Sequence, residues 1–159
     1  MNTCADHQHC RQSALETAEH YCHQAGLRLT ALRRQVLSLI WESHQPVKAY
    51  DLMVRIPRQG DAPAQPPTVY RALDFLLENG LIHRLESINA YIGCSHPNRH
   101  EDCYFLLCRG CGLAEECCSP TLAAAIREAS TSHAFTASTT TLEIAGVCTQ
   151  CSNNDETPA

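Results

Sequence analysis

The chain has 159 residues, of which 44% are hydrophobic and 18% are charged, and its formal net charge at pH 7 is −5. This composition excludes a disordered chain, and no apolar run reaches the roughly 18 residues that a membrane span needs. The first residues lack the basic and then apolar pattern of a secretory signal, so we expect a cytoplasmic protein with no membrane partner.

Three helices are predicted in the first third of the chain. Gly26 is expected to end the first, Thr30 is a suitable N-cap for the second, and Pro57 stops the third. The predicted helices lie within residues 13–25, 29–43 and 48–56, after a flexible tail at residues 1–12.

A fourth helix is predicted to start at Pro67, where a missing N–H costs nothing, and Asn79-Gly80 is expected to end it. Two strands joined by a turn near Asn89 follow. Together these elements predict a winged-helix DNA-binding domain over residues 13–93, in which the last helix enters the major groove. The apolar residues of that helix recur at i, i+4, i+7 and i+8 and form its expected buried stripe: Val69, Leu73, Leu76 and Leu77.

The outer face of the fourth helix carries Thr68, Tyr70 and Arg71 in its first turns. Arg71 can donate two hydrogen bonds to a guanine, and the Tyr70 ring can contact a thymine methyl group or a phosphate. A solvated helix face with one exposed arginine would give the same pattern. The charge distribution weakly favours DNA: residues 28–84 hold eight Lys and Arg against five acids, which is +3, whereas residues 85–159 hold three against nine, which is −6.

The rear of the chain is predicted to form a small α/β domain over residues 104–151 with the element order β-β-α-β. Ser119 is expected to cap its helix. One face of the sheet is expected to be covered, and the opposite face or an edge is available for a second copy. Residues 94–103 are expected to form a hinge and metal-binding loop, and residues 152–159 a flexible tail. The overall fold class is α+β.

Eleven cysteines and nine histidines favour metal binding or redox chemistry over a disulfide framework, because no export signal is evident. Cys108 and Cys111 form one C-x-x-C pair, and Cys148 and Cys151 form another. Two such turns complete a tetrahedral four-sulfur shell, which predicts a structural zinc site. A thioredoxin-like redox motif is the alternative, but two motifs that each follow a strand favour zinc.

A second metal site is predicted from mixed nitrogen, sulfur and oxygen donors at the domain junction. His83 and Cys94 belong to the hairpin, and Glu116 follows the first C-x-x-C turn. An ion bound there would fix the angle between the two domains and so couple metal binding to conformation. His100 is the preferred fourth ligand and His96 the alternative, with Glu101 and Cys103 as possible substitutes. The cysteines expected to remain free thiols are Cys4, Cys10, Cys22, Cys117 and Cys118.

The stretches "LRLTALRRQVL", "AYDLM" and "PPTVYRALDFLLENGLIHRLES", together with Cys94 and the two C-x-x-C pairs, resemble the ferric uptake regulator family and, within it, the zinc uptake regulator branch. The resemblance covers about residues 14 to 151. It implies a homodimeric repressor of zinc-uptake genes that binds a palindromic operator in double-stranded DNA and holds two Zn²⁺ ions per chain, one structural and one regulatory.

The same resemblance implies roles for individual residues. Tyr70 and Arg71 would contact bases, and Tyr50 would lie near phosphates. The C-terminal domain would dimerise the chain. Two alternatives remain: an iron- or peroxide-responsive regulator of the same family, and a thiol oxidoreductase that uses a C-x-x-C pair. No catalytic motif is found, so the chain is not expected to be an enzyme.

Overall fold

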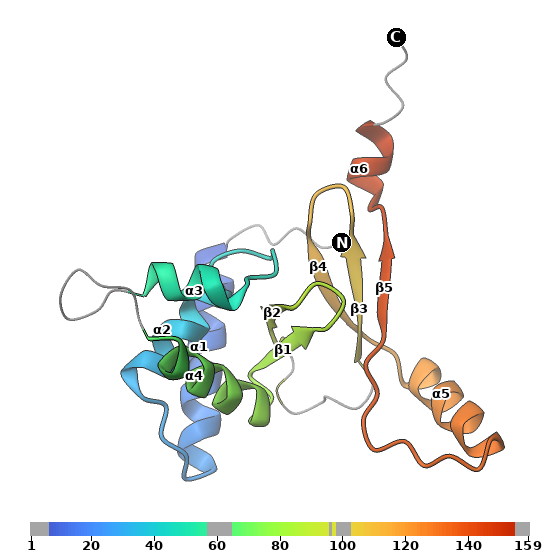
Figure 1. The fold of residues 1–159 in the computed structure, drawn as a ribbon, viewed down its shortest axis with the longest axis horizontal. Helices are drawn as coiled ribbons and strands as arrows, with labels where there is room; N and C mark the ends of the chain where they lie inside the picture. Colours follow the sequence, from blue (N-terminus) through green and yellow to red (C-terminus); the bar gives the residue numbers. More distant parts are fainter. Residues whose placement is uncertain (1–6, 57–64, 96, 98–102, 155–159) are drawn as a thin grey trace. The chain divides into compact units, whose positions relative to one another are not determined.

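The computed structural model describes residues 7–56, 65–95, 97 and 103–154. The chain divides into two compact units, an N-terminal unit of residues 2–97 and a C-terminal unit of residues 98–159, which also takes in Met1 (Figure 1). None of the helices in the described ranges is both long and apolar enough to cross a membrane.

The N-terminal unit begins with four helices, and the predicted N-cap of the second is confirmed: the Thr30 hydroxyl accepts a hydrogen bond of 3.4 Å from the Arg33 N–H. The first helix starts at His7 and not at Ser13, so the prediction of a tail was wrong for residues 7–12. Residues 7–12 contain neither proline nor glycine, so nothing in them stops a helix from extending toward the N-terminus. The helices are α1 (His7–Gln24), α2 (Ala31–Ile40), α3 (Ala49–Arg55) and α4 (Pro66–Glu78).

A β-hairpin follows α4, as predicted. It consists of β1 (Ile82–Leu85) and β2 (Ala90–Gly93), which pair antiparallel. The turn contains Asn89 at φ 48°, a left-handed conformation that asparagine tolerates better than most residues. Val47 extends the hairpin by one bridge to Tyr91, through hydrogen bonds of 2.9 and 2.8 Å. Four helices and this hairpin make the predicted winged-helix arrangement.

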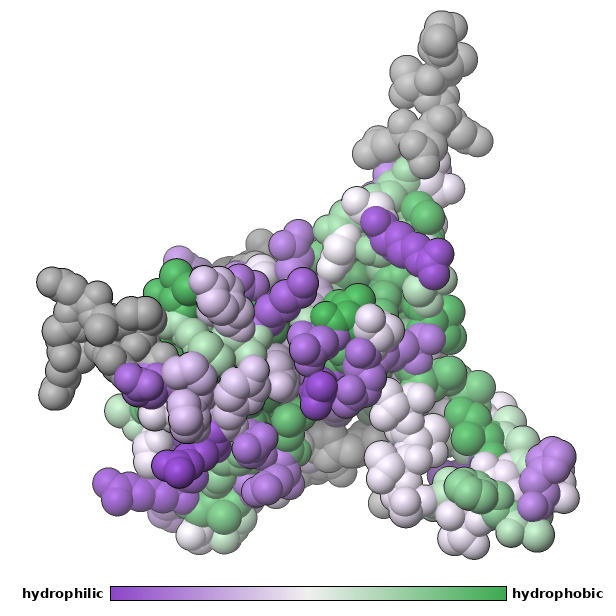
Figure 2. Space-filling view, viewed as in Figure 1, coloured by the Kyte–Doolittle hydropathy of each residue, from purple (hydrophilic) through white to green (hydrophobic). Residues whose placement is uncertain are grey.

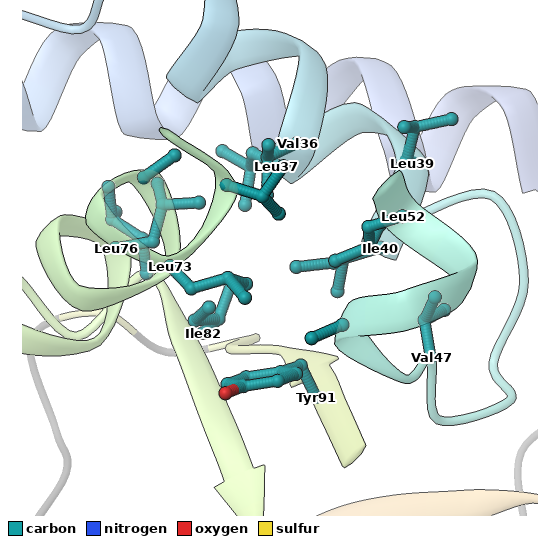
Figure 3. Close-up of a cluster of buried hydrophobic side chains, with 14 of the residues drawn as sticks. Val36, Leu37, Leu39, Ile40, Val47, Leu52, Leu73, Leu76, Ile82 and Tyr91 are labelled. Atoms are coloured by element: carbon teal, nitrogen blue, oxygen red, sulfur yellow. The ribbon is translucent and has the colours of Figure 1, made fainter. Parts of the chain in front are cut away.

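The core of the N-terminal unit lies where α2, α3 and α4 meet the hairpin (Figure 3). Ile40 from α2, Leu52 from α3 and Leu73 from α4 are at most 1% exposed, and each such side chain contributes on the order of 1.5–3 kcal/mol of burial free energy. The predicted stripe of α4 is confirmed for its first three members, Val69, Leu73 and Leu76. Leu77 is only partly buried, and Ala72, which was not predicted to belong to the stripe, is buried.

The C-terminal unit is a three-stranded sheet with the order β4-β3-β5. Strand β3 (Cys103–Cys108) pairs antiparallel with β4 (Ala114–Cys118) and parallel with β5 (Glu143–Gly146). Helix α5 (Pro120–Ser132) supplies the crossover, and the predicted β-β-α-β order is confirmed. Ser119 caps α5, because its hydroxyl accepts a 3.3 Å hydrogen bond from the Leu122 N–H.

Two features of this unit differ from expectation. The structure describes all of residues 120–132, and none of them is buried, so α5 does not cover a sheet face in the single chain; it lies at the end of the sheet where β3 begins (Figure 1). A short helix, α6 (Thr149–Asn154), follows β5, so residues 152–154 are helical where a tail was expected. Cys148 immediately precedes this helix and Cys151 lies in it, whereas the sequence predicted this C-x-x-C pair only to follow a strand.

Apolar side chains are exposed after α5 and at the last strand of the C-terminal unit. Phe135 is 63% exposed, Ile144 on β5 is 45% exposed and Val147 is 57% exposed. Hydrophobic surface is visible in this part of the molecule in Figure 2. Strand β5 is also an edge of the sheet, with β3 as its neighbour on the inner side. An edge strand beside exposed apolar residues is a surface on which another chain can pack.

Candidate metal centres and nucleic-acid interface

The four predicted zinc ligands lie together at one end of the C-terminal sheet. Cys108 ends β3, and the chain then turns through Cys111; Cys148 and Cys151 follow β5, the parallel neighbour of β3. Because parallel strands end at the same sheet edge, the two pairs meet. Their four sulfur atoms all lie within 4.8 Å of one another, and the sulfurs of Cys111 and Cys148 are 3.9 Å apart. This is the arrangement of a closed tetrahedral thiolate site.

Two glycines make the first turn possible. A Cβ atom on Gly110 would lie 2.8 Å from the Cβ and 2.9 Å from the sulfur of Cys151, so any larger residue would push the second pair away. Gly112 has φ +73°, a conformation that L side chains rarely adopt. The C-x-x-C spacing is evident in the sequence, but the close approach of Gly110 to Cys151 depends on the pairing of β3 with β5.

The protein environment already favours a thiolate in this cluster. Hydrogen bonds from the backbone N–H groups of Cys148, at 3.3 Å, and of Cys111 lower the pKa of Cys108 from 9.0 to about 6. The hydrogen bond with the Cys148 side chain is the main cause that raises the pKa of Cys151 to about 12. One sulfur is therefore ionised while a neighbour holds its proton, and a thiolate is the form that binds a metal.

A second pair of donors lies in the N-terminal unit. His83 is on β1, and Cys94 comes directly after β2, where its N–H donates to the Leu81 carbonyl at 3.1 Å. Their ligand atoms lie within 4.8 Å of each other, and Cys94 is only 4% exposed. The hairpin thus brings an imidazole and a thiol together, a donor pair that suits zinc.

Close packing fixes the residue before Cys94. A Cβ atom on Gly93 would lie 2.1 Å from Cε2 of the Trp41 indole, so only glycine fits there. Trp41 is the C-cap of α2, and its ring therefore rests against the end of β2. Sequence reasoning missed this contact, because nothing in the spacing of Trp41 and Gly93 indicates that they meet.

The remaining predicted ligands are placed as follows. Glu116 is half-buried on β4 in the C-terminal unit, opposite Phe105 of β3. Cys103 begins β3 and is bound in a disulfide, so it is not available as a substitute ligand in this state. His96, His100 and Glu101 lie outside the described residues.

The disulfide joins Cys103 to Cys118, so the prediction that Cys118 is a free thiol was wrong. The two residues are cross-strand partners of β3 and β4, and their Cα atoms are 4.0 Å apart. Leu107 pairs with Ala114 across the loop at residues 108–113, and counting outward from that pair places Cys103 opposite Cys118. Cys22 and Cys117 do carry thiols, as predicted, whereas Cys4 lies outside the described residues.

The predicted DNA-contacting residues are all exposed. Thr68, Tyr70 and Arg71 lie on the outer side of the first turns of α4, with Tyr70 46% exposed, while Val69 between them is fully buried. Tyr50, near the start of α3, is 73% exposed. Helix α4 therefore has a buried face and an exposed face. The exposed face carries the hydrogen-bonding groups that base or phosphate contacts require.

The chain joins a winged-helix unit with an exposed polar helix to an α/β unit with a four-cysteine cluster. These two units define a class of two-domain, metal-binding transcription regulators. Residues 24–145 match the model of a protein family described as "Ferric uptake regulator family". Together with the relatives below, this shows that the chain belongs to the ferric uptake regulator family. It is a family of transcription regulators and not of enzymes, which confirms the expected absence of catalysis.

Several relatives are similar over nearly the whole chain. The "Zinc uptake regulation protein" of Escherichia coli (strain K12) is 36% identical over 143 residues, which cover 88% of this chain and 82% of that protein. A solved structure described as "Zinc Uptake Regulator Complexed With Zinc AND DNA" has a TM-score of 0.83 and 33% identity, covering 91% of this chain and 97% of the other. The "Crystal structure of holo XcZur" has a TM-score of 0.79 and 40% identity, covering 89% and 98%. These likenesses confirm the predicted family and fold.

Proposed function

We propose that the protein is a zinc-responsive transcriptional repressor that binds palindromic operator DNA as a homodimer and represses zinc-uptake genes. The observation that carries this proposal is the pairing of His83 with Cys94 within 4.8 Å in the winged-helix unit. A thiolate beside an imidazole selects zinc over harder metals such as manganese or ferrous iron. The names of the relatives, which are zinc uptake regulators, support the same metal.

Each chain would hold two Zn²⁺ ions with different roles. The four-cysteine cluster would hold a structural ion, because four thiolates fill a tetrahedral shell and leave no open position. His83 and Cys94 would hold the regulatory ion, with Glu116 and a loop histidine, His100 or His96, as the other ligands. Since those donors come from both units, an ion shared by them would stabilise one relative orientation of the units over others.

The DNA-binding surface would be the exposed side of α4. Arg71 would donate to a guanine and Tyr70 would contact a base or the backbone, while Thr68 and Tyr50 would contact phosphates or base edges. The exposure of all four side chains supports this assignment. The protein would act in the cytoplasm, where the operator is.

The C-terminal unit would form the homodimer. Support comes from the exposed edge of β5 and from the exposed Ile144 and Val147, which a second copy would cover. A two-fold dimer presents two α4 helices to the DNA, and its symmetry matches that of a palindromic operator.

The test is operator binding at controlled free zinc. Wild-type protein that retains its structural ion should lose most of its operator affinity when a mild chelator removes the regulatory ion, and should regain it when zinc is added back. His83→Ala should remain weak at the same zinc level, whereas His133→Ala, an exposed histidine just after α5, should behave as wild type. Unchanged operator binding after zinc removal, with circular dichroism unchanged, would show that zinc is not the signal.

An iron- or peroxide-responsive regulator of the same family is the alternative function. Cys94 counts against it, because a soft thiolate disfavours ferrous iron. The same titration with Fe²⁺ in place of Zn²⁺ separates the two: operator binding that responds to iron at lower free concentration than to zinc would favour the alternative. An oxidoreductase function of the C-x-x-C pairs is excluded by membership of this family.

A further inference from the structure

The C-terminal unit contains a second cluster of metal-ligating groups, at the opposite end of the sheet from the four-cysteine cluster. Cys103 and Cys118 are direct cross-strand partners of β3 and β4, and Glu116 lies two residues before Cys118. Alternate residues of a strand point to the same face, and partners on neighbouring strands share it. All three groups therefore project from one face, and their ligand atoms lie within 4.8 Å of one another.

We propose that Cys103, Cys118 and Glu116 form an additional zinc site. The site can bind zinc when the two cysteines are reduced and cannot bind it when they are joined in the disulfide. Two thiolates and one carboxylate are ligands that Zn²⁺ takes readily, and a water molecule would complete the tetrahedron. Cys118 is exposed and its two partners are half-buried, so an ion and its water can reach the site from solvent.

This site is distinct from the four-cysteine cluster. Cys103 and Cys108 begin and end the same strand, and five residue steps at the usual rise per residue separate them by about 16 Å. No single ion spans that distance. The thiol of Cys117, by contrast, points to the opposite face of the sheet from its neighbours on β4, so it is not a ligand of this site.

The disulfide and the metal site exclude each other, because both use the same two sulfur atoms. A hydroperoxide would convert one into the other. The two thiolates give up two electrons and form the S–S bond; hydrogen peroxide accepts the two electrons and, with two protons, leaves as two molecules of water; and the Zn²⁺ ion is released without change of charge. A thiol reductant reverses the step by exchange through a mixed disulfide.

Glu116 is also a proposed ligand of the regulatory ion. If Glu116 is also a ligand of the regulatory ion, as the proposed function has it, the two sites compete for one carboxylate, and oxidation of the cysteine pair would release Glu116 for the regulatory ion. This coupling rests on the proposed function. The existence of the site does not, because it depends only on residues of one sheet.

The experiment uses the full-length chain with His83→Ala, which weakens the regulatory site, and with zinc retained in the four-cysteine cluster. Co²⁺ is the probe, because cobalt bound by thiolates gives a charge-transfer absorption that cobalt bound by oxygen and nitrogen lacks. The reduced protein should take up about one Co²⁺ per chain with this absorption. Protein treated with one equivalent of hydrogen peroxide, and shown to have lost two titratable thiols, should take up none.

Two variants in the same His83→Ala background complete the test. Cys118→Ser should remove the absorption. Cys103→Ser should remove it as well, and it serves as the second test if Cys118→Ser folds poorly. Cys117→Ser, a matched control one residue away on the opposite face, should leave it unchanged. Thiolate absorption that persists in both Cys118→Ser and Cys103→Ser, or reduced protein that takes up no Co²⁺, would overturn the proposal. Neither result would bear on whether zinc controls operator binding.

Discussion

At the scale of single residues, Cys108 shows how the fold prepares a metal ligand before the metal arrives. Backbone N–H groups directed at its sulfur lower its pKa to about 6. Cys108 is therefore ionised at neutral pH in the folded, metal-free chain, and it takes up a proton only as the pH falls through about 6. The opposite shift at Cys151, to about 12, keeps that thiol protonated until a metal displaces the proton.

Proton release on zinc binding tests this difference. A cluster of four fully protonated thiols would release about four protons per zinc ion. At pH 7.5 we expect about one fewer, because Cys108 has already lost its proton, and we expect the number to rise as the pH is lowered through 6. Calorimetry in buffers of different ionisation enthalpy measures the number directly. Release of four protons at pH 7.5 would contradict the lowered pKa.

The zinc affinity of the cluster should also depend on the protonation of Cys108. Below pH 6 a proton competes with the metal for the Cys108 sulfur, whereas above pH 6 it does not. The affinity should therefore fall more steeply with acidification below pH 6 than above it.

Residues also mark the limit of sequence reasoning. The spacing of Cys108, Cys111, Cys148 and Cys151 predicted their cluster, because ligand spacing is a local property. The disulfide between Cys103 and Cys118 could have been found by counting outward from the turn of the hairpin. The contact of Gly93 with Trp41 could not, because it depends on how α2 packs against β2, and no local pattern encodes that packing.

At the scale of elements, α4 has a buried face and a free face, and the two should respond differently to mutation. Arg71→Ala should cost about 1–3 kcal/mol of operator binding at the base that Arg71 contacts, with little change in folding stability, because the side chain is exposed. Fluorescence anisotropy with the operator and with random DNA of equal length measures the effect. Arg127→Ala, an exposed arginine on α5 in the other unit, is the matched control for loss of charge.

Random DNA provides the decisive comparison. If Arg71 reads a base, its loss should weaken operator binding more than binding to random DNA, since non-specific affinity depends mainly on phosphate contacts. An equal loss on both would mean that Arg71 contacts the backbone and carries no sequence information.

The elements themselves were largely predictable, since each has a local cause. Pro66 and Pro67 begin α4, Gly80 follows its end with φ +62°, and the apolar spacing between them selects the packed face. The extension of α1 to His7 was missed because its sequence is polar all round and gives no periodic signal. Helix α6 was missed because six residues are too few for a pattern.

At the scale of the whole molecule, the single chain leaves a surface incomplete. Helix α5 buries none of its residues, all of which are described, and β5 leaves one edge of the sheet open beside exposed apolar side chains. Both facts agree with a C-terminal unit whose core is completed by a second copy. The sequence predicted the strands and α5 of this unit, but neither α6 nor the exposure of α5, because a local pattern does not say what an apolar helix face packs against.

Disruption of that surface tests the homodimer. Ile144→Glu places a charge on the edge strand, where a partner would have to bury it, and should shift the protein toward the mass of a single chain in sedimentation experiments. Ile88→Glu is the matched control, because Ile88 is 43% exposed, nearly as much as Ile144 at 45%, but lies in the hairpin turn of the other unit. A dimer that is unaffected by Ile144→Glu would place the interface elsewhere.

The stacking of Trp41 against Gly93 has a practical consequence. The chain has one tryptophan, so all of its indole emission comes from a ring that touches the residue just before Cys94. Trp41 and Cys94 line the same cavity, so an ion bound by the Cys94 sulfur should change the emission of the indole. The intrinsic fluorescence of Trp41 can therefore be used to follow the binding and release of an ion at the hairpin without an attached dye.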